Sequence, residues 1–229
     1  KETANVSKKY FGYEFFERSV SFYDNIPTPT TFKLGPGDEI VISLWGETNS
    51  REKMTINKEG AIYYKSIGFI NIANKTLEEA ESILTEELSK VYSTLKDSAQ
   101  STKLKLEVGK VKSINVYFTG QVQAPGISLI HPYSDIFSAI IQAGGIRKNG
   151  TLRNVQLIRN NKLIKTTDFY SFFKDAENNF SEMRLLEGDI IHVPVVGKRV
   201  DIDGEILNPG TFELIESENY SDLIKYASG

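Results

Sequence analysis

The stretches "FTGQVQAPGISLI" at residues 118–130 and "IDGEILNPGTFELI" at residues 202–215 are two versions of one pattern. In each, a run of β-forming residues reaches a Gly, and a Pro-Gly pair follows after four intervening residues. The shared positions recur 84 residues later, as Val116, Gly120, Pro125 and Gly126 in the first version and Val200, Gly204, Pro209 and Gly210 in the second. A repeat of this length indicates a copied folding unit. The sequence therefore predicts one complete unit and the beginning of another.

The complete copy is expected to be a small α+β domain over residues 111–195. After the strands and turns of the repeated motif, Ser134 is placed to cap a short helix, which Gly144 ends in left-handed geometry. Asn160-Asn161 then separates two strand-like runs and predicts a hairpin, and "LLEGDIIHVPV" supplies a last strand. The order strand, strand, helix, hairpin and strand is that of a β-grasp domain, in which a helix crosses a mixed sheet.

Residues 32–110 are expected to form a separate domain built around one amphipathic helix. The "GPG" at Gly35–Gly37 predicts a tight turn before a buried strand, and Gly68 separates two shorter strands. In "TLEEAESILTEELSKVY", Thr76 and Glu79 have the spacing of a capping box, and the apolar residues that follow share one helical face. The run "KLKLEVG" returns to the alternation of a strand.

The two ends of the chain flank these domains. Residues 1–31 are rich in aromatic residues without a regular period, and we interpret them as an extended arm. Residues 196–229 contain the hairpin and the first part of the helix of a second, truncated repeat. We expect the natural gene to continue past Gly229. We also expect the hairpin at 199–214 to pack against the domain at 32–110 or against a neighbouring chain, because so short a segment buries too little surface alone.

Composition excludes several classes of protein and of site. The formal net charge of −3 does not supply the clustered basic residues that contact nucleic-acid phosphates. The absence of Cys excludes disulfides and thiolate ligands within this stretch. There is no apolar run of the roughly 18–20 residues that a transmembrane helix needs, and the first residues lack the layout of a signal peptide.

Several patterns that could indicate chemistry have simpler interpretations. The glycines of "GPGDEI" precede a strand, whereas a phosphate-binding loop opens a helix. Asp201 and Asp203 would share one face of a strand as a metal pair does, but a solvated strand face explains them better. His131 and His192 have no partner motif, and the glutamates of the predicted helix lie mainly on its polar side. We therefore expect no catalytic centre, no metal site and no cofactor.

Aromatic residues are the remaining candidates for ligand contact. Trp45, Tyr63, Tyr64 and Tyr117 could stack on sugar rings through their apolar faces while their polar atoms remain hydrated. Residues of these types more often complete a core or an interface, and that alternative remains open. The positions expected to be structural turns are Gly35, Gly37, Gly120, Pro125, Gly126, Gly204, Pro209 and Gly210.

Four stretches of the sequence, taken in chain order, resemble the bacterial outer-membrane polysaccharide export proteins. In that family, an export-signature domain precedes β-grasp repeats of the soluble-ligand-binding (SLBB) type. The four stretches are "LGPGDEIVISLWG" at 34–46, "INKEGAIYYKSIGFINIANKTLEEAESIL" at 56–84 and "VYFTGQVQAPG" at 116–126 with "AIIQAGGI" at 139–146. The resemblance covers about residues 32–229. It assigns residues 32–110 to the export domain, 111–195 to the first SLBB domain and 196–229 to the truncated second repeat.

The resemblance implies a function that the residues alone do not show. It implies a ring-forming component of a capsular or exopolysaccharide translocon, in the periplasm or outer membrane of a Gram-negative bacterium and without catalysis. The implied partners are polysaccharide, further copies of the protein and an inner-membrane polysaccharide copolymerase, and nucleic acid is not among them. Two alternatives stay open: a carbohydrate-binding or adaptor module that regulates assembly, and an enzyme acting on polysaccharide, for which no acid/base pair is evident.

Overall fold

The computed structural model of the chain describes residues 9–17, 27–97, 99, 101–177, 180 and 183–228. The chain divides into two compact units. One comprises Asn25–Ser113 and is called the proximal unit here. The other, the repeat unit, combines Ile114–Gly229 with the N-terminal segment Lys1–Asp24.

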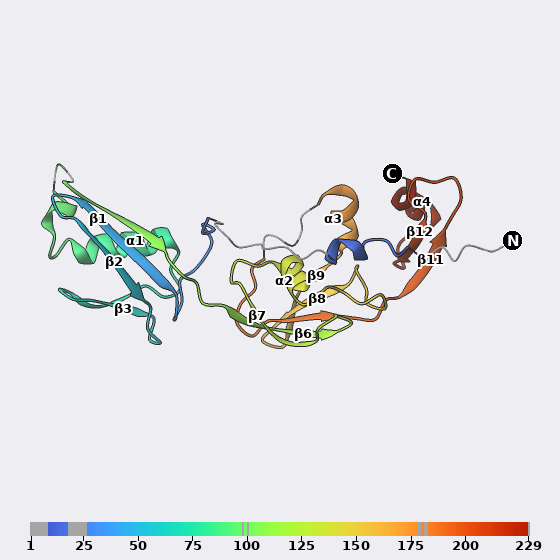
Figure 1. Cartoon of the computed structure of the whole chain (residues 1–229), viewed down its shortest axis with the longest axis horizontal. Helices are drawn as coiled ribbons and strands as arrows, with labels where there is room; N and C mark the ends of the chain where they lie inside the picture. Colours follow the sequence, from blue (N-terminus) through green and yellow to red (C-terminus); the bar gives the residue numbers. More distant parts are fainter. Residues whose placement is uncertain are drawn as a thin grey trace. The chain divides into compact units, whose positions relative to one another are not determined.

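The proximal unit contains a three-stranded antiparallel sheet in the order β2-β1-β5, a separate β3-β4 hairpin and one long helix, α1 (Figure 1). Its elements are β1 (Glu39–Gly46), β2 (Ser50–Thr55), β3 (Ala61–Tyr64), β4 (Gly68–Asn71), α1 (Leu77–Leu88), the 3-10 turn η2 (Ser93–Leu95) and β5 (Thr102–Val108). Helix α1 packs on β5, and the Glu81 carboxylate accepts a hydrogen bond from the Leu106 N–H at 2.9 Å.

The capping box predicted for α1 is present. The Thr76 hydroxyl accepts from the Glu79 N–H at 3.2 Å, and the Thr76 N–H donates to the Glu79 carboxylate at 2.8 Å. Ala80, Leu84 and Leu88 form the buried face, and the helix ends at Leu88, one turn earlier than its sequence pattern suggests. The first turn of the helix therefore satisfies two backbone donors through its own side chains.

The "GPGD" turn before β1 is closed by a buried carboxylate. Asp38 accepts hydrogen bonds from the backbone N–H groups of Gly35 and Lys112, each at 2.9 Å. Burial raises the pKa of Asp38 despite these two bonds. Gly37 has a φ of 95°, whereas Gly35 is not left-handed. Only the second of the two predicted turn glycines thus requires the freedom of a residue without Cβ.

The repeat unit is built on a five-stranded mixed sheet in the order β7-β6-β10-β8-β9. Strand β10 runs parallel to β6 and the other pairs are antiparallel. The elements of this first copy are β6 (Ile114–Gly120), β7 (Gly126–Ile130), α2 (Ile136–Gln142), β8 (Val155–Arg159), β9 (Lys162–Thr167), α3 (Phe169–Asp175) and β10 (Ile190–Val193). The α+β class and the β-grasp order expected from the sequence are confirmed.

The turns of the first copy form at the predicted residues, but the N-cap of its helix α2 does not. Gly120 and Gly126 have φ values of 79° and 126°, and Asn160-Asn161 forms the β8–β9 turn with φ values of 50° and 60°. The N-cap of α2, however, is Asp135 and not Ser134. The carboxylate of Asp135 accepts from the Ser138 N–H at 2.8 Å.

The second copy contributes the hairpin of β11 (Lys198–Ile202) and β12 (Gly210–Leu214), followed by helix α4 (Tyr220–Ser228). The sequence suggested that this hairpin packs on the domain at 32–110 or on another chain, and that expectation was wrong. The hairpin packs on the first copy instead, and Phe212, Leu223 and Ala227 join the hydrophobic core of the repeat unit. The β11–β12 hairpin and α4 are thus held against the first copy through this shared core.

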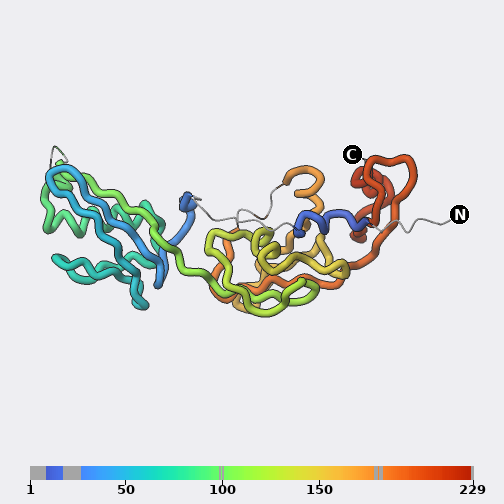
Figure 2. The backbone as a smooth tube through the Cα atoms, viewed as in Figure 1, coloured from blue at the N-terminus to red at the C-terminus, as the bar shows by residue number. Residues whose placement is uncertain are grey.

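Residues 9–17 are part of the same core, which corrects their interpretation as part of an extended arm. Residues 1–8 and 18–26 of the predicted arm lie outside the described residues. The 3-10 turn η1 (Tyr13–Phe16) buries Tyr13 and Phe16 in the repeat unit. Just before it, the backbone pairs with β12: the Phe11 N–H donates to the Thr211 carbonyl at 3.0 Å, and the Thr211 N–H donates to the Lys9 carbonyl at 2.8 Å. Figure 2 shows this blue segment lying beside the red end of the chain.

Candidate functional site

The exposed aromatic residues of the proximal unit lie mainly on the β3–β4 hairpin. Tyr63 and Phe69 are a cross-strand pair, with ring centroids 5.2 Å apart and exposed fractions of 59% and 71%. Trp45, near the end of β1, is also exposed. Two adjacent aromatic faces in water can stack on the apolar face of a sugar ring. The sequence identified Tyr63 but not Phe69, because only strand pairing brings Phe69 beside it.

Tyr64 does not belong to this exposed set. It is only 2% exposed, because successive residues of a strand point to opposite faces and Tyr63 takes the solvent side. Its selection as a saccharide contact is therefore corrected: Tyr64 is a core residue. Tyr117, the fourth candidate, is exposed on the outer face of the five-stranded sheet in the repeat unit.

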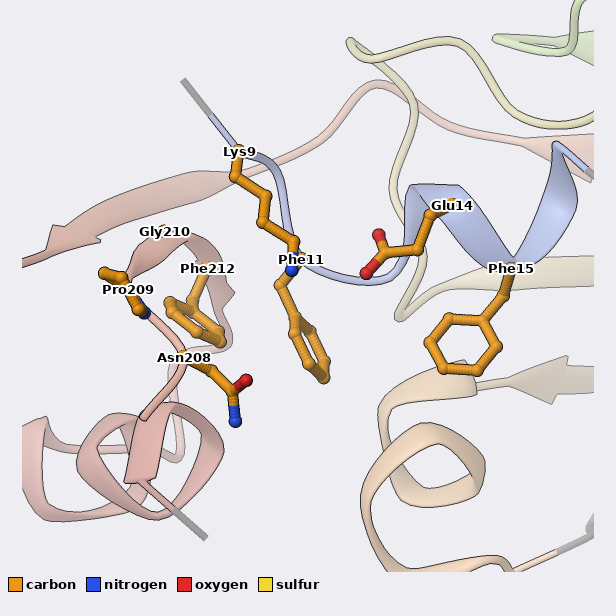
Figure 3. A pocket seen from close by; sticks show the side chains of 8 residues that line it. All are labelled: Lys9, Phe11, Glu14, Phe15, Asn208, Pro209, Gly210 and Phe212. Atoms are coloured by element: carbon orange, nitrogen blue, oxygen red, sulfur yellow. The ribbon is translucent and has the colours of Figure 1, made fainter. Parts of the chain in front are cut away.

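A pocket of about 190 Å³ lies in the repeat unit between the N-terminal segment and the second copy (Figure 3). The rings of Phe11 and Phe212 stack with centroids 5.0 Å apart, while Phe15 stacks on Phe173 at 4.1 Å. The pocket is lined by Lys9, Phe11, Glu14, Phe15, Asn208, Pro209, Gly210 and Phe212.

This pocket combines apolar ring faces with three kinds of polar group. Lys9 offers a cation, Glu14 a carboxylate and Asn208 an amide, and their side chains surround the Phe11–Phe212 pair in Figure 3. Ring faces with a few hydrogen-bonding groups are typical of a site for a hydroxylated ligand. Glu14 is the single carboxylate of the lining, and bond cleavage between sugars normally requires two. The geometry thus suits contact with a saccharide better than cleavage of one.

The interface between the two copies contains a buried charge cluster that the sequence did not reveal. Arg153 precedes β8, and its guanidinium donates to the Asp168 carboxylate at 2.9 and 3.0 Å and to Glu218 at 2.7 Å. It also lies over the rings of Tyr170 and Tyr226, 4.6 and 5.4 Å from their centroids. These residues come from both copies, so the cluster joins one to the other.

The electrostatics of this cluster favour its charged form. Burial opposes the charge on Arg153, but hydrogen bonds to Glu218 and Asp168 outweigh it and raise the pKa of the guanidinium. Burial likewise opposes the charge on Glu218, yet bonds from Arg153 and Tyr226 hold the pKa of Glu218 below its ordinary value of 4.5. Such pairing indicates a structural role, because each charged group is hydrogen-bonded to a group of opposite charge within the interface.

A third carboxylate at the same interface, that of Glu213, behaves differently from Glu218. Glu213 accepts from the Thr151 hydroxyl and from the Leu152 N–H, the latter at 3.0 Å. Burial raises the pKa of Glu213 in spite of these bonds and of the nearby Arg153. A raised carboxyl pKa can indicate an acid catalyst, but Glu213 faces the first copy and does not line the pocket.

The two histidines and Asp201, which the sequence singled out, lie at different places in the repeat unit: His131 just after β7, His192 on β10 and Asp201 on β11. His192 shares a hydrogen bond with the Thr119 hydroxyl at 2.8 Å on the sheet face, whereas His131 packs edge-on against Tyr133. Asp201 accepts from Thr211 at 2.7 Å within the second hairpin. Among the described residues, no group of three or more His, Asp or Glu is placed to hold a metal ion. Over those residues, no helix combines the length and apolarity that crossing a membrane requires.

Comparison with known proteins places both units in recognised families. The model of the polysaccharide biosynthesis/export protein family matches residues 26–105, and the SLBB domain model matches residues 115–167. Two sequences of the polysialic acid transport protein KpsD from Escherichia coli are each 22% identical over 214 residues. The match covers 93% of this chain and 37% of each relative, so the chain spans little more than a third of their length. The chain thus carries a domain of the polysaccharide biosynthesis/export protein family, and this domain is followed by an SLBB domain.

Proposed function

We propose that this component of polysaccharide export works as an oligomeric conduit and performs no catalysis on the polymer. The observation that carries the proposal is the pairing of an export-family domain with an SLBB domain in one chain. The described surfaces add support, since they offer ring faces and isolated polar groups without a paired acid and base. Passage of a polymer requires weak, repeated contacts of this kind, because tight binding at one site would stop movement.

The same reasoning extends to location and partners. We place the conduit in the periplasm or at the outer membrane of a Gram-negative bacterium, where it receives polymer from an inner-membrane copolymerase. The relatives are named for transport of polysialic acid, an acidic polymer. The cargo of this chain is accordingly a capsular or exopolysaccharide, and polysialic acid is a suitable probe.

Two places on the molecule are proposed as polymer contacts. One is the exposed Tyr63–Phe69 pair on the proximal unit, where Trp45 is a further exposed aromatic residue. The other is the pocket beside Phe11 and Phe212, where Lys9 offers a cation to an acidic sugar. The first is a pair of exposed rings and the second is a pocket of about 190 Å³, so each would contact a short segment of a polymer.

Sedimentation and electron microscopy test the oligomeric part of the proposal. The protein is expected to form closed assemblies at high concentration, and polysialic acid incubated with it should keep its chain-length distribution. Sedimentation as a monomer at every concentration would contradict the conduit. Shortening of the polymer would contradict the absence of catalysis.

A second function, as a carbohydrate-binding adaptor that regulates assembly, is favoured by one observation. The pocket lies between the N-terminal segment and the second copy, and Phe15 of its lining stacks on Phe173 of α3, so a bound saccharide could change the packing of these segments. Calorimetry with polysialic acid fragments distinguishes the two. An adaptor should bind a fragment as a monomer with a defined stoichiometry, whereas the conduit should bind weakly and only when assembled.

A further inference from the structure

The three-stranded sheet of the proximal unit has an outer face on which charged side chains flank an uncharged central strand. The central strand, β1, contributes Val41, Ser43 and Trp45 to this face, at alternate positions. Their register partners on the two outer strands are all charged and exposed: Arg51 and Lys53 on β2, and Lys103, Lys105 and Glu107 on β5. The face therefore has a neutral floor between two charged edges, and the floor ends at the half-exposed Trp45.

The carboxylates of this face lie away from Trp45. Glu107 is the register partner of Val41, and Glu39 begins β1 at the far end of the strand. Each is already paired, Glu107 with Arg51 at 3.3 Å and Glu39 with Lys53 at 3.7 Å. The end of the face that holds Trp45 is thus its cationic end.

Two lysines on β5 supply the positive charge at that end. Lys103 lies directly opposite Trp45, and within the part of the chain that the structure describes it forms no ion pair. Lys105 follows two residues later and pairs with Glu81 of α1 at 3.2 Å. Its side chain is 57% exposed. An ammonium group beside the indole ring is therefore open to a ligand.

The ion pairs of this face can exchange partners at little cost to the fold. The Arg51 side chain is 70% exposed and that of Glu107 is 51% exposed, so water solvates both charges. Exposed pairs of this kind contribute little to stability. A ligand that brings its own carboxylates can therefore engage Arg51 and Lys105 in place of Glu107 and Glu81.

The spacing of these groups fits an extended chain of acidic sugars. Lys103 and Lys105 are about 7 Å apart along β5, and Arg51 lies two strand spacings, about 10 Å, across the floor from Lys105. An indole face packs on the apolar side of a sugar ring, while ammonium and guanidinium groups bind carboxylates. A ring beside cations at such intervals suits a polymer whose sugars carry acid groups.

We infer that this outer face, centred on Trp45, binds acidic polysaccharide. The indole stacks on one sugar, and Lys103, Lys105 and Arg51 pair with carboxylates of the chain. Charge complementarity selects this ligand, because a neutral glycan would use the ring alone. The inference rests on the proposed function in polysaccharide export and adds to it a contact surface and the chemistry of the ligand.

Trp45 makes the test direct. It is the single Trp of the chain and is 45% exposed, so indole fluorescence reports on this face alone. Polysialic acid fragments are titrated into the whole chain at low salt, at the highest protein concentration used for sedimentation. We expect a saturable change in emission that weakens as salt is added. Dextran, a neutral glycan, and a thymidine oligonucleotide, a polyanion without acidic sugars, should bind much more weakly.

Three variants test the charges. K103Q/K105Q should raise the dissociation constant for polysialic acid about tenfold. E107Q should lower it about threefold, because it frees Arg51 and removes a negative charge, and tighter binding cannot arise from a loss of fold. The matched control is K58Q/K75Q, which removes two exposed lysines of the same unit that lie outside the sheet and should change the constant less than about twofold.

The outcomes separate this inference from the proposed function. Emission that polysialic acid leaves unchanged, or equal affinity in the wild type and K103Q/K105Q, overturns the inference. Equal binding of dextran would show that charge is not recognised, and equal binding of the oligonucleotide that the sugar is not; either result also contradicts it. A wild-type chain that sediments as a monomer at every concentration contradicts the oligomeric conduit, whatever the response of Trp45.

Discussion

Replacement of Arg153 by Met removes the charge that joins the second copy to the first. Arg153 is almost wholly buried, with a side-chain exposure of 4%, and its hydrogen bonds reach Asp168 at 2.9 Å and Glu218 at 2.7 Å. Met keeps much of the apolar volume but leaves both carboxylates without their cation. Breaking a buried pair in this way costs about 3–5 kcal/mol.

The structure favours the lower end of this range. Asp168 is one-third exposed and can regain water, whereas Glu218 is mostly buried and cannot. We therefore expect the free energy of opening the β11–β12 hairpin to fall by about 3 kcal/mol. The equilibrium constant for opening should then rise about a hundredfold. The proximal unit lies outside this contact and should keep its stability.

Native-state hydrogen exchange measures the opening of the β11–β12 hairpin directly. The amides of Thr211–Leu214 should exchange about a hundredfold faster in R153M, since exchange reports local opening. The control is R51M, because Arg51 forms an exposed pair with Glu107, and such pairs contribute at most about 1 kcal/mol. Unchanged exchange at 211–214 in R153M would refute the assignment of the cluster as the link between copies. If R153M does not fold, E218Q should show a smaller acceleration at the same amides.

Three further predictions concern turns, caps and pH. G120A should lose more than about 2 kcal/mol of stability in denaturant unfolding, because at a φ of 79° a Cβ would lie 2.0 Å from the Val193 carbonyl oxygen. G126A has open space around the added Cβ and should lose only the ~1–2 kcal/mol that a positive φ costs an L-residue. Equal losses in the two variants would contradict this reasoning. T76A should destabilise the proximal unit by about 1 kcal/mol through loss of the N-cap, and no change in its melting would argue against the capping box. Because the pKa of Glu218 lies below its ordinary value of 4.5, its contribution is complete above pH 4.5 and is lost as pH falls from there through the folded pKa. E218Q should therefore flatten the acid limb of a stability–pH curve, and an unchanged limb would exclude this contribution.

Local patterns in the sequence were sufficient for most of the secondary structure. The capping box at Thr76 and the turn at Asn160-Asn161 depend on residues a few positions apart, so spacing alone reveals them. The pattern around Gly120 recurs around Gly204 with the same spacing to Pro-Gly, and this recurrence reveals the copied hairpin. The sequence predicts Ser134 as the N-cap of α2, but the neighbouring Asp135 is also of a capping type, and only the backbone geometry shows that Asp135 is the cap.

The contacts that join distant segments were not predictable in this way. The N-terminal segment enters the core because Phe11 stacks on Phe212 and Phe16 packs against Phe169, and aperiodic aromatic residues give no sign of their partners. The bond network of Arg153 likewise spans the two copies. For the candidate site, alternation on a strand could have separated Tyr63 from Tyr64, but the pocket depends on packing that no short stretch encodes.

Deletion of the gene in the bacterium that carries it tests the central claim most directly, with polysaccharide measured separately at the cell surface and within the cell envelope. The account predicts that polymer of normal chain length continues to be made but accumulates inside, and that the intact gene restores it to the surface. Loss of synthesis, or polymer of altered length that still reaches the surface, would contradict a non-catalytic role in export.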